Sequence, residues 1–214
     1  TVNYDHTMNE ASWQQGVDAA LASVSAGMND LQKAIVLHDY LTVNCEYDKE
    51  NADRGNVPDA SHTTYGVFAN RTAVCDGYAL SYKYLLQQVG INCYMVTSDA
   101  MEHAWNLIEL DGSYYQVDVT WDDPAWDLTG RSCHNYMFLS DTAFANVPAK
   151  DHHYDWQVTE GSNIVSYKAT DTTYDHAFWS DSTAPLVFDG DTCCYTAYDS
   201  AKATAVIRKK DFTS

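Results

Sequence analysis

The chain has 214 residues, the length of a single domain or of one domain with an appendage. Its 12 Lys and Arg residues against 30 Asp and Glu residues give a formal net charge of −18. Such a surface repels phosphate backbones and anionic lipid heads, so we expect neither nucleic-acid binding nor membrane attachment. No apolar run approaches the ~20 residues of a spanning helix, so we expect no membrane insertion. We also expect the protein to be a monomer.

Six cysteines leave the redox compartment open. An even number invites a disulfide framework, but a chain of this length does not require one. If one cysteine is catalytic, five remain, and at least one of those is unpaired. The chain starts at Thr1 without a Met and is acidic with few Lys residues. These features favour a processed protein that is secreted or held at the cell surface.

Two helices are predicted at the start of the chain. Residues 7–10 have the T-x-x-E form of a capping box, and apolar residues at helical spacing follow until about Gly27. A second helix begins at Asn29 or Asp30 and carries His38 on its apolar stripe. We expect His38 to be a hydrogen-bonded histidine at the edge of the core rather than a ligand.

A long polar stretch, residues 48–73, separates these helices from a third one. The stretch reads as a loop, and loops of that length in a compact domain are usually functional. The third helix is predicted to follow Cys75 and to stop at Gly90, because glycine commonly ends helices.

After Gly90 the apolar period changes from 3.6 to 2, which predicts strands. Three strands cover residues 92–98, 102–110 and 113–121, and Asp111-Gly112 joins the last two as a hairpin. Shorter β-like runs follow at residues 135–140, 164–167, 186–188 and 203–208. The composition becomes more polar from Gly161, so we predict a core at residues 1–160 and a β-rich extension, or the start of a further domain, at residues 161–214.

The hairpin predicts a meeting of two functional side chains. A two-residue loop pairs Leu110 with Ser113, so paired positions sum to 223, and His103, Trp105, Asp118 and Thr120 share one face. Asp118 is then the diagonal neighbour of His103, close enough for a carboxylate to fix the tautomer of the ring. Taken alone, a chance His–Asp pair on a sheet face is the more common explanation.

Cys75 changes this interpretation because it stands where a loop enters the third helix. A helix N-terminus carries partial positive charge and unpaired N–H groups, which favour a thiolate and can hold an oxyanion. The alternative is a buried and inert cysteine, which is the usual state of a lone cysteine.

Three segments then match a known family in order and spacing: VCDGYA at residues 74–79, GINCYMV at 90–96, and EHAWNLIELDGSYYQVDVTWDDP at 102–124. With them the chain resembles the transglutaminase-like superfamily of papain-like cysteine enzymes, and within it the bacterial, secreted members. The likeness covers about residues 30–125. It implies an α+β fold with a papain- and transglutaminase-like core, whose N-terminal helices pack on an antiparallel β-sheet, and a β-rich C-terminal extension.

The resemblance also implies roles for individual residues. Cys75 corresponds to the nucleophile, His103 to the general base and then acid, and Asp118 to the residue that orients His103. Tyr65 is a candidate for helping to hold the oxyanion, although ordinary packing explains it equally well. The indoles of Trp105 and Trp121 are candidate walls of the pocket.

The implied activity is cleavage of amide bonds in proteins or peptides, cell-wall peptides included, through a thioester on the cysteine. The enzyme would be a hydrolase or an acyl transferase. The alternative is a non-catalytic surface module that binds glycan or protein, and an intact triad argues against it. Acidic loops are usually only solvated, so we expect no required metal and no cofactor. The charge of −18 leads us to expect cationic, amine-rich substrates.

Overall fold

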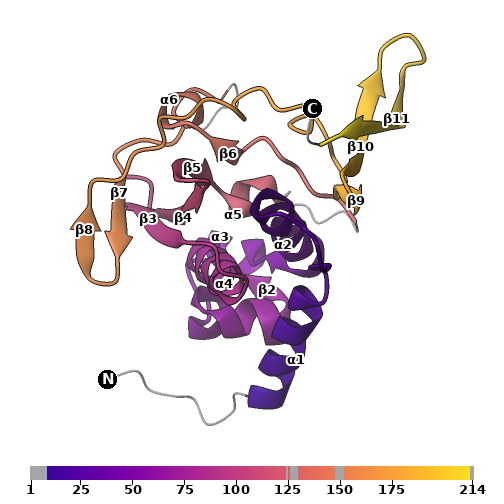
Figure 1. The fold of residues 1–214 in the computed structure, drawn as a ribbon. Coiled ribbons are helices and arrows are strands. Elements are labelled where there is room, and N and C mark those ends of the chain that lie inside the picture. Colours follow the sequence, from indigo (N-terminus) through magenta and orange to yellow (C-terminus); the bar gives the residue numbers. More distant parts are fainter. Residues whose placement is uncertain (1–8, 124, 126–129, 148–151, 213–214) are drawn as a thin grey trace.

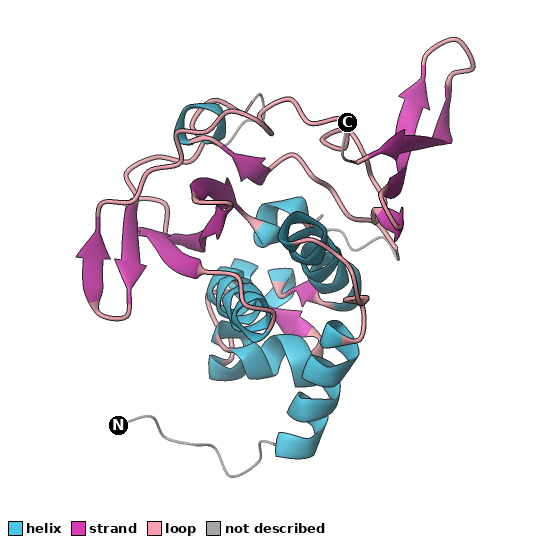
Figure 2. Ribbon diagram, viewed as in Figure 1, coloured by secondary structure: helices cyan, strands magenta, loops and turns pink. Residues whose placement is uncertain are grey.

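The computed structural model describes residues 9–123, 125, 130–147 and 152–212. Its helices gather below a curved arc of strands, and a hairpin near the C-terminus stands away from the body (Figure 1). Figure 2 shows the same separation, with helices in cyan and strands in magenta. The elements in chain order are α1 (Glu10–Leu21), α2 (Asp30–Asn44), β1 (Glu46–Tyr47), α3 (Lys49–Asp53), η1 (Asp59–His62), η2 (Gly66–Asn70), β2 (Thr72–Ala73), α4 (Cys75–Gln88), β3 (Cys93–Ser98), β4 (His103–Leu110), β5 (Ser113–Val117), α5 (Val119–Asp122), β6 (Met137–Leu139), α6 (Asp141–Phe144), β7 (Gln157–Glu160), β8 (Asn163–Val165), β9 (Val187–Asp189), β10 (Thr192–Asp199) and β11 (Thr204–Asp211).

The first two helices begin at asparagine caps. The side chain of Asn9 accepts hydrogen bonds from the first turn of α1, so Asn9 rather than Thr7 caps this helix, and Thr7 itself lies outside the described residues. Asn29 caps α2 and completes a capping box with Gln32, as the predicted start of that helix required. Helix α1 ends at Leu21, earlier than the predicted end near Gly27.

Six strands form one antiparallel sheet in the order β6-β5-β4-β3-β7-β8. Leu110 pairs with Ser113 and Asn106 with Val117, so the predicted register, with partners that sum to 223, is confirmed. The predicted strand 113–121 is too long, because β5 ends at Val117 and α5 follows. Asp118 caps α5 by accepting from the Trp121 N–H, so Thr120 lies in a helix and not opposite His103.

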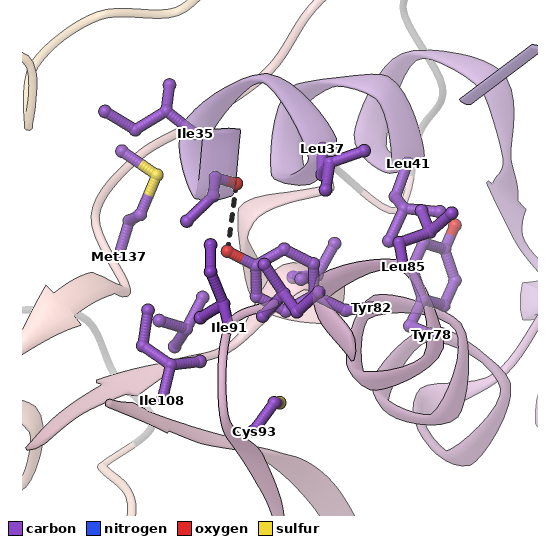
Figure 3. Close-up of a cluster of buried hydrophobic side chains, with 14 of the residues drawn as sticks. Ile35, Leu37, Leu41, Tyr78, Tyr82, Leu85, Ile91, Cys93, Ile108 and Met137 are labelled. Atoms are coloured by element: carbon purple, nitrogen blue, oxygen red, sulfur yellow. Dashed lines mark hydrogen bonds between the residues drawn. The ribbon is translucent and has the colours of Figure 1, made fainter. Parts of the chain in front are cut away.

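Helices α2 and α4 pack on one face of this sheet and bury the main core (Figure 3). The side chains of Ile35, Leu41, Leu85 and Ile108 are fully buried there. The hydroxyl of Tyr82 donates to the carbonyl of Ala34 at 3.0 Å, so this buried polar group is satisfied. This contact fixes the position of α4, and therefore of its first residue, relative to α2.

The other face of the sheet is covered by an aromatic cluster. Trp105, Leu107, Tyr136 and Phe144 are among its buried members. Because both faces are covered, the alternation of buried and exposed residues in β4 is nearly lost: six of its eight residues are buried, and His103 and Glu109 are half-buried. The expected α+β architecture of helices on an antiparallel sheet is confirmed.

The C-terminal region is rich in strands, as expected. Strands β9, β10 and β11 form a separate three-stranded antiparallel sheet. Strands β7 and β10 were not predicted, because their partly exposed polar side chains hide the apolar alternation. The division into two domains stays a prediction, and its boundary falls in the turn between β7 and β8. In the described part of the chain, no helix has the length and apolar character that crossing a bilayer requires.

The predicted loop 48–73 contains several short elements, namely α3, η1, η2 and β2. It packs tightly against the start of α4. A Cβ on Gly77 would come within 2.5 Å of the Ser61 carbonyl oxygen and 2.9 Å of the Ala73 Cβ. Gly77 therefore lets the loop approach the helix closely, which holds the residue two positions before it in place.

Candidate active site

Cys75 is the first residue of α4 and is partly exposed. Val74, the residue before it, is the N-cap residue and makes no side-chain hydrogen bond to the N–H groups of the first turn. These groups and the helix dipole favour negative charge at this end. The sequence prediction that Cys75 opens the third helix is confirmed.

The structure brings His103 and Asp118 together. Nε2 of His103 lies 2.6 Å from Oδ2 of Asp118, the distance of a strong charge-assisted hydrogen bond. His103 is at the start of β4 and Asp118 directly follows β5, so the hairpin register produces the contact. Because Nε2 donates to the carboxylate, Nδ1 is the ring nitrogen that is left for another partner.

The charge of His103 depends on its burial and on the side chains of Asp118 and Cys75. Burial lowers the pKa of His103, but the charge and hydrogen bond of Asp118 outweigh it. A hydrogen bond with the Cys75 side chain and the charge of that residue also raise the pKa of His103, which reaches about 10. The imidazolium is therefore the stable form near neutral pH, next to the sulfur.

The Asp118 carboxylate is fully buried and accepts three hydrogen bonds. Burial raises the pKa of Asp118, but the His103 charge and the hydrogen bonds outweigh it and hold that pKa well below its usual range. Its second oxygen accepts from the Trp121 N–H at 3.1 Å. A third donor, Nε2 of His153, lies 2.8 Å from the same Oδ2 that His103 uses. Sequence reasoning missed this role of His153, since nothing in the His152-His153 pair indicates which ring turns inward.

A cleft of about 380 Å³ opens beside His103. In the described part of the chain its lining residues are Tyr47, His103, Thr120, Trp121, Asp123, Ala125 and Tyr136. The Trp121 indole stacks on the His103 ring with centroids 5.1 Å apart, so it is both a wall of the cleft and a support for the imidazole. A partly enclosed space that reaches the His103 ring can admit a substrate chain.

Tyr47 is a functional candidate that sequence reasoning did not find. It lines the cleft, and its pKa is raised by burial and then by the nearby charges of Cys75 and Asp53. The phenol therefore stays protonated and can donate a hydrogen bond close to the sulfur. The only signal in the sequence is its place upstream of Cys75, which it shares with several other aromatic residues.

Two of the predicted site residues are not among the described residues that line the cleft. The Tyr65 hydroxyl accepts from the backbone N–H of Asn9 at 2.8 Å, at the start of α1, which favours the packing alternative for this residue. Trp105 is only 1% exposed and stacks behind His103, with its Nε1 donating to Gln116 at 2.8 Å. It supports the His103 ring from within the core and is not a wall of the cleft.

A second carboxylate contacts the sulfur directly. The Cys75 thiol donates to Oδ1 of Asp76 at 3.1 Å, and the other oxygen of Asp76 lies 2.9 Å from Nδ1 of His62. Burial raises the pKa of Asp76, but these two hydrogen bonds outweigh it and lower that pKa. A carboxylate that accepts from the Cys75 side chain acts against negative charge on the sulfur, because like charges repel.

A separate His–Asp cluster is buried beside this site. Oδ1 of Asp39 lies 3.0 Å from Nδ1 of His38 and 2.9 Å from Nε2 of His134. Nε2 of His38 lies 3.2 Å from Asp122, and Nδ1 of His134 lies 3.0 Å from the Ser182 carbonyl oxygen. Both rings are thus hydrogen-bonded at both nitrogens, as we expected for His38.

Two groups of described residues have the chemistry of metal ligands: His38, Asp39 and His134, and His103, Asp118 and His153. In the first group every ring nitrogen already contacts an oxygen atom. In the second group the nitrogens that face the carboxylate both carry hydrogen-bonding protons. A metal ion could bind to either group only if it replaced these hydrogen bonds.

A cysteine at a helix start, beside a His–Asp pair on an antiparallel sheet, is the arrangement of papain-like enzymes. Residues 18–119, which include these three residues, match the family model of the transglutaminase-like superfamily. The matched segment, just under half of the chain, is similar to the core domain of this superfamily. Over 115 residues, 47% of the chain, it is 26% identical to kyphoscoliosis peptidase of Mus musculus, and the match spans 17% of that mouse protein.

Two solved structures resemble the chain more weakly. A TGase superposes with a TM-score of 0.44 at 17% identity, covering 56% of this chain and 34% of that one. An arylamine N-acetyltransferase from Salmonella typhimurium superposes with a TM-score of 0.45 at 13% identity, covering 94% of this chain and 85% of that one.

Proposed function

We propose that the protein is a cysteine-dependent enzyme that acts on amide bonds of proteins or peptides through a thioester on Cys75. The observation that carries this proposal is the 2.6 Å contact between His103 and Asp118 beside the cysteine at the start of α4. The cleft at His103 supports it, because it gives a substrate access to the imidazole.

The reaction would begin with the thiolate of Cys75 attacking the carbonyl carbon of the amide. The oxyanion that forms would be held by N–H groups in the first turn of α4, with the Tyr47 hydroxyl as a second donor. The His103 imidazolium gives its Nδ1 proton to the leaving amine, the C–N bond breaks, and a thioester remains on Cys75.

The second half returns the enzyme to its starting state. Water or a primary amine attacks the thioester carbonyl, and neutral His103 takes a proton from it. The C–S bond then breaks and the thiolate is released, leaving an acid or a new amide. Asp118 holds the same ring nitrogen throughout and stabilises the imidazolium. Which nucleophile arrives second decides whether the enzyme is a hydrolase or an acyl transferase.

We further propose that the substrates or acceptors are cationic. A hollow of about 680 Å³ shares Tyr47 and Ala125 with the catalytic cleft, and four acids, Glu46, Asp48, Glu50 and Asp53, are among its lining residues. Together with the net charge of −18, this negative field should attract amines. Capture of a cationic substrate should then slow as salt is raised, and a rate independent of ionic strength would argue against steering.

The activity can be tested with dimethylcasein and a fluorescent primary amine. Incorporation of the amine supports acyl transfer, while new N-termini, or ammonia released without incorporation of the amine, support hydrolysis. The Cys75→Ala variant should lose activity by at least about 10³-fold. Cys194→Ala, which also removes a partly exposed thiol, is the matched control and should keep activity. Equal activity in both variants would overturn the proposal, whereas an unchanged, non-turned-over partner bound by Cys75→Ala would favour a binding module.

A further inference from the structure

We propose that His153 is a positioning residue that fixes the Asp118 carboxylate for His103, an inference that rests on the function proposed above. Both histidines contact the same oxygen, Oδ2 of Asp118, at 2.6 Å from His103 and 2.8 Å from His153. The carboxylate is therefore held from two sides, and rotation about its last bond would break both hydrogen bonds.

The geometry also determines the tautomer of His153. A ring nitrogen at 2.8 Å from an ionised carboxylate must carry a proton, so Nε2 is the donor. Nδ1 of His153 is buried and has no hydrogen-bond partner among the described residues. A proton on Nδ1 would be buried without an acceptor, which is costly, so His153 acts as a neutral donor.

Aromatic rings enclose His153 and make this arrangement rigid. Its ring centroid lies 3.8 Å from that of Phe144, 4.0 Å from Trp121 and 4.7 Å from Trp105. Trp121 and Trp105 also stack on His103, so the same indoles support both histidines. This packing fixes the position of each ring without adding a charge.

The charged neighbours agree with a neutral His153. Burial lowers the pKa of His153, and the nearby charge of His103 lowers it as well, while Asp118 and Asp122 raise it. The net pKa lies below the ordinary value for histidine. The pKa of His103, on the other side of the same carboxylate, is raised. Near neutral pH His103 is therefore the charged ring and His153 the neutral one. Beyond His103 the next titratable groups are Cys75, Asp76 and His62.

Loss of the His153 hydrogen bond should loosen the orientation of His103 relative to the sulfur. In His153→Phe the ring volume is retained, but Asp118 keeps only the His103 and Trp121 donors. The imidazolium should then stabilise the Cys75 thiolate less well. Alkylation of Cys75 should require a pH about one unit higher, which is about tenfold slower at pH 6. His153→Gln offers an amide N–H at a similar reach and should restore the wild-type profile.

The first measurement uses ¹⁵N-histidine NMR on the wild-type chain. At neutral pH His153 should be uncharged with its proton on Nε2, and it should gain a second proton only at a lower pH than an ordinary histidine. A proton on Nδ1, or ordinary titration near pH 6.5, would overturn the proposal. This readout needs neither activity nor a folded variant, so it decides on His153 even if the proposed enzymatic function fails.

The second measurement is the pH profile of Cys75 alkylation by iodoacetamide, followed by peptide mapping. His153→Phe should shift the profile upward and His153→Gln should not. The control is His152→Phe, at an exposed histidine next in sequence, which should behave like wild type. An unshifted profile in a folded His153→Phe, or an equal shift in His152→Phe, would overturn the proposal. If wild-type Cys75 itself reacts like an ordinary thiol, the enzymatic proposal fails instead.

Discussion

Two buried clusters of histidine and aspartate lie side by side in this chain and differ in how fully their ring nitrogens are used. In the cluster around Asp39, both nitrogens of His38 and of His134 contact oxygen atoms. In the cluster around Asp118, His103 uses Nε2 on the carboxylate and leaves its other nitrogen toward Cys75. The first cluster is complete without a ligand, and the second is completed by a sulfur atom and an open cleft.

One short helix connects the two clusters. Helix α5 begins after Asp118 and ends at Asp122, which contacts His38. The residue types at its two ends are nearly the same, so chemistry alone does not separate a stabilising cluster from a reactive one. Access to a substrate separates them, because His38 has no exposed surface, whereas His103 lines the cleft. Saturated hydrogen bonds among buried oxygen and nitrogen atoms add stability, whereas a ring nitrogen that faces a thiol beside a cleft is placed for reactivity.

Changing each central aspartate should separate the two functions. Asp118→Asn should lower amide turnover by about 10³–10⁴-fold, since the amide would favour the wrong tautomer of His103. The matched change Asp39→Asn should leave turnover of the folded protein within about threefold of wild type, because Asp39 does not contact the reactive groups. Turnover measured below both unfolding temperatures checks this, and equal losses would show that the two clusters do not differ in role.

The Asp39 cluster should dominate stability. Asp39 accepts from His38, His134, Ser132 and the Leu186 N–H, so Asp39→Ala leaves several buried donors without an acceptor. Removing one partner of a buried charged network costs about 3–5 kcal/mol of unfolding free energy. Denaturant unfolding measures the loss, with Asp53→Ala, at an exposed ion pair, as a control expected to cost less than about 1 kcal/mol. Similar losses in both variants would contradict the assignment.

The same cluster predicts a pH dependence of stability. Burial lowers the pKa of His38, but hydrogen bonds to Asp122 and Asp39 outweigh it and raise that pKa to about 9. The folded state therefore keeps a proton that the unfolded state releases near pH 6.5. This stabilisation should be complete below pH 6.5 and should be lost as the pH rises toward 9, on the order of 3 kcal/mol. Unfolding free energies measured at pH 6 and pH 9 check this. His38→Gln should reduce the difference but not abolish it, because the raised pKa of His103 contributes in the same direction.

The smallest expected effect concerns Asp76, whose carboxylate lies next to the Cys75 sulfur. Because Asp76 accepts a hydrogen bond from the Cys75 thiol, Asp76→Asn should make the thiolate easier to form. We expect alkylation of Cys75 at pH 6 to become about three- to tenfold faster. Asp99→Asn, at an exposed loop position, is the control and should change nothing. A slower reaction in Asp76→Asn would mean that Asp76 instead supports the active form.

The sequence predicts much of the reactive cluster because its information is local. A two-residue hairpin loop determines the register that brings His103 to Asp118, and the helix stripe after Cys75 places the cysteine at a helix start. The strand prediction failed at Thr120 because the Asp118 side chain caps a helix, and a capping bond competes with strand pairing without changing the apolar pattern.

The remaining features depend on contacts between distant segments. His153 lies 35 residues beyond Asp118, and no periodicity shows that it, rather than His152, turns toward the carboxylate. Tyr65 and Tyr47 are both tyrosines upstream of Cys75, and only the tertiary fold sends one to Asn9 and the other to the cleft. The Asp39 cluster joins α2 to segments more than 90 residues away, which the sequence pattern does not connect.

The most direct test of cysteine-dependent chemistry is the relative alkylation rate of the thiols within one molecule. Cys133 and Cys194 are partly exposed like Cys75, so they serve as internal references for access. At pH 6, limiting iodoacetamide followed by peptide mapping should label Cys75 about 10–100-fold faster than either reference. The difference should disappear in His103→Gln. Equal labelling of the three cysteines in the wild-type chain would contradict an activated nucleophile at Cys75.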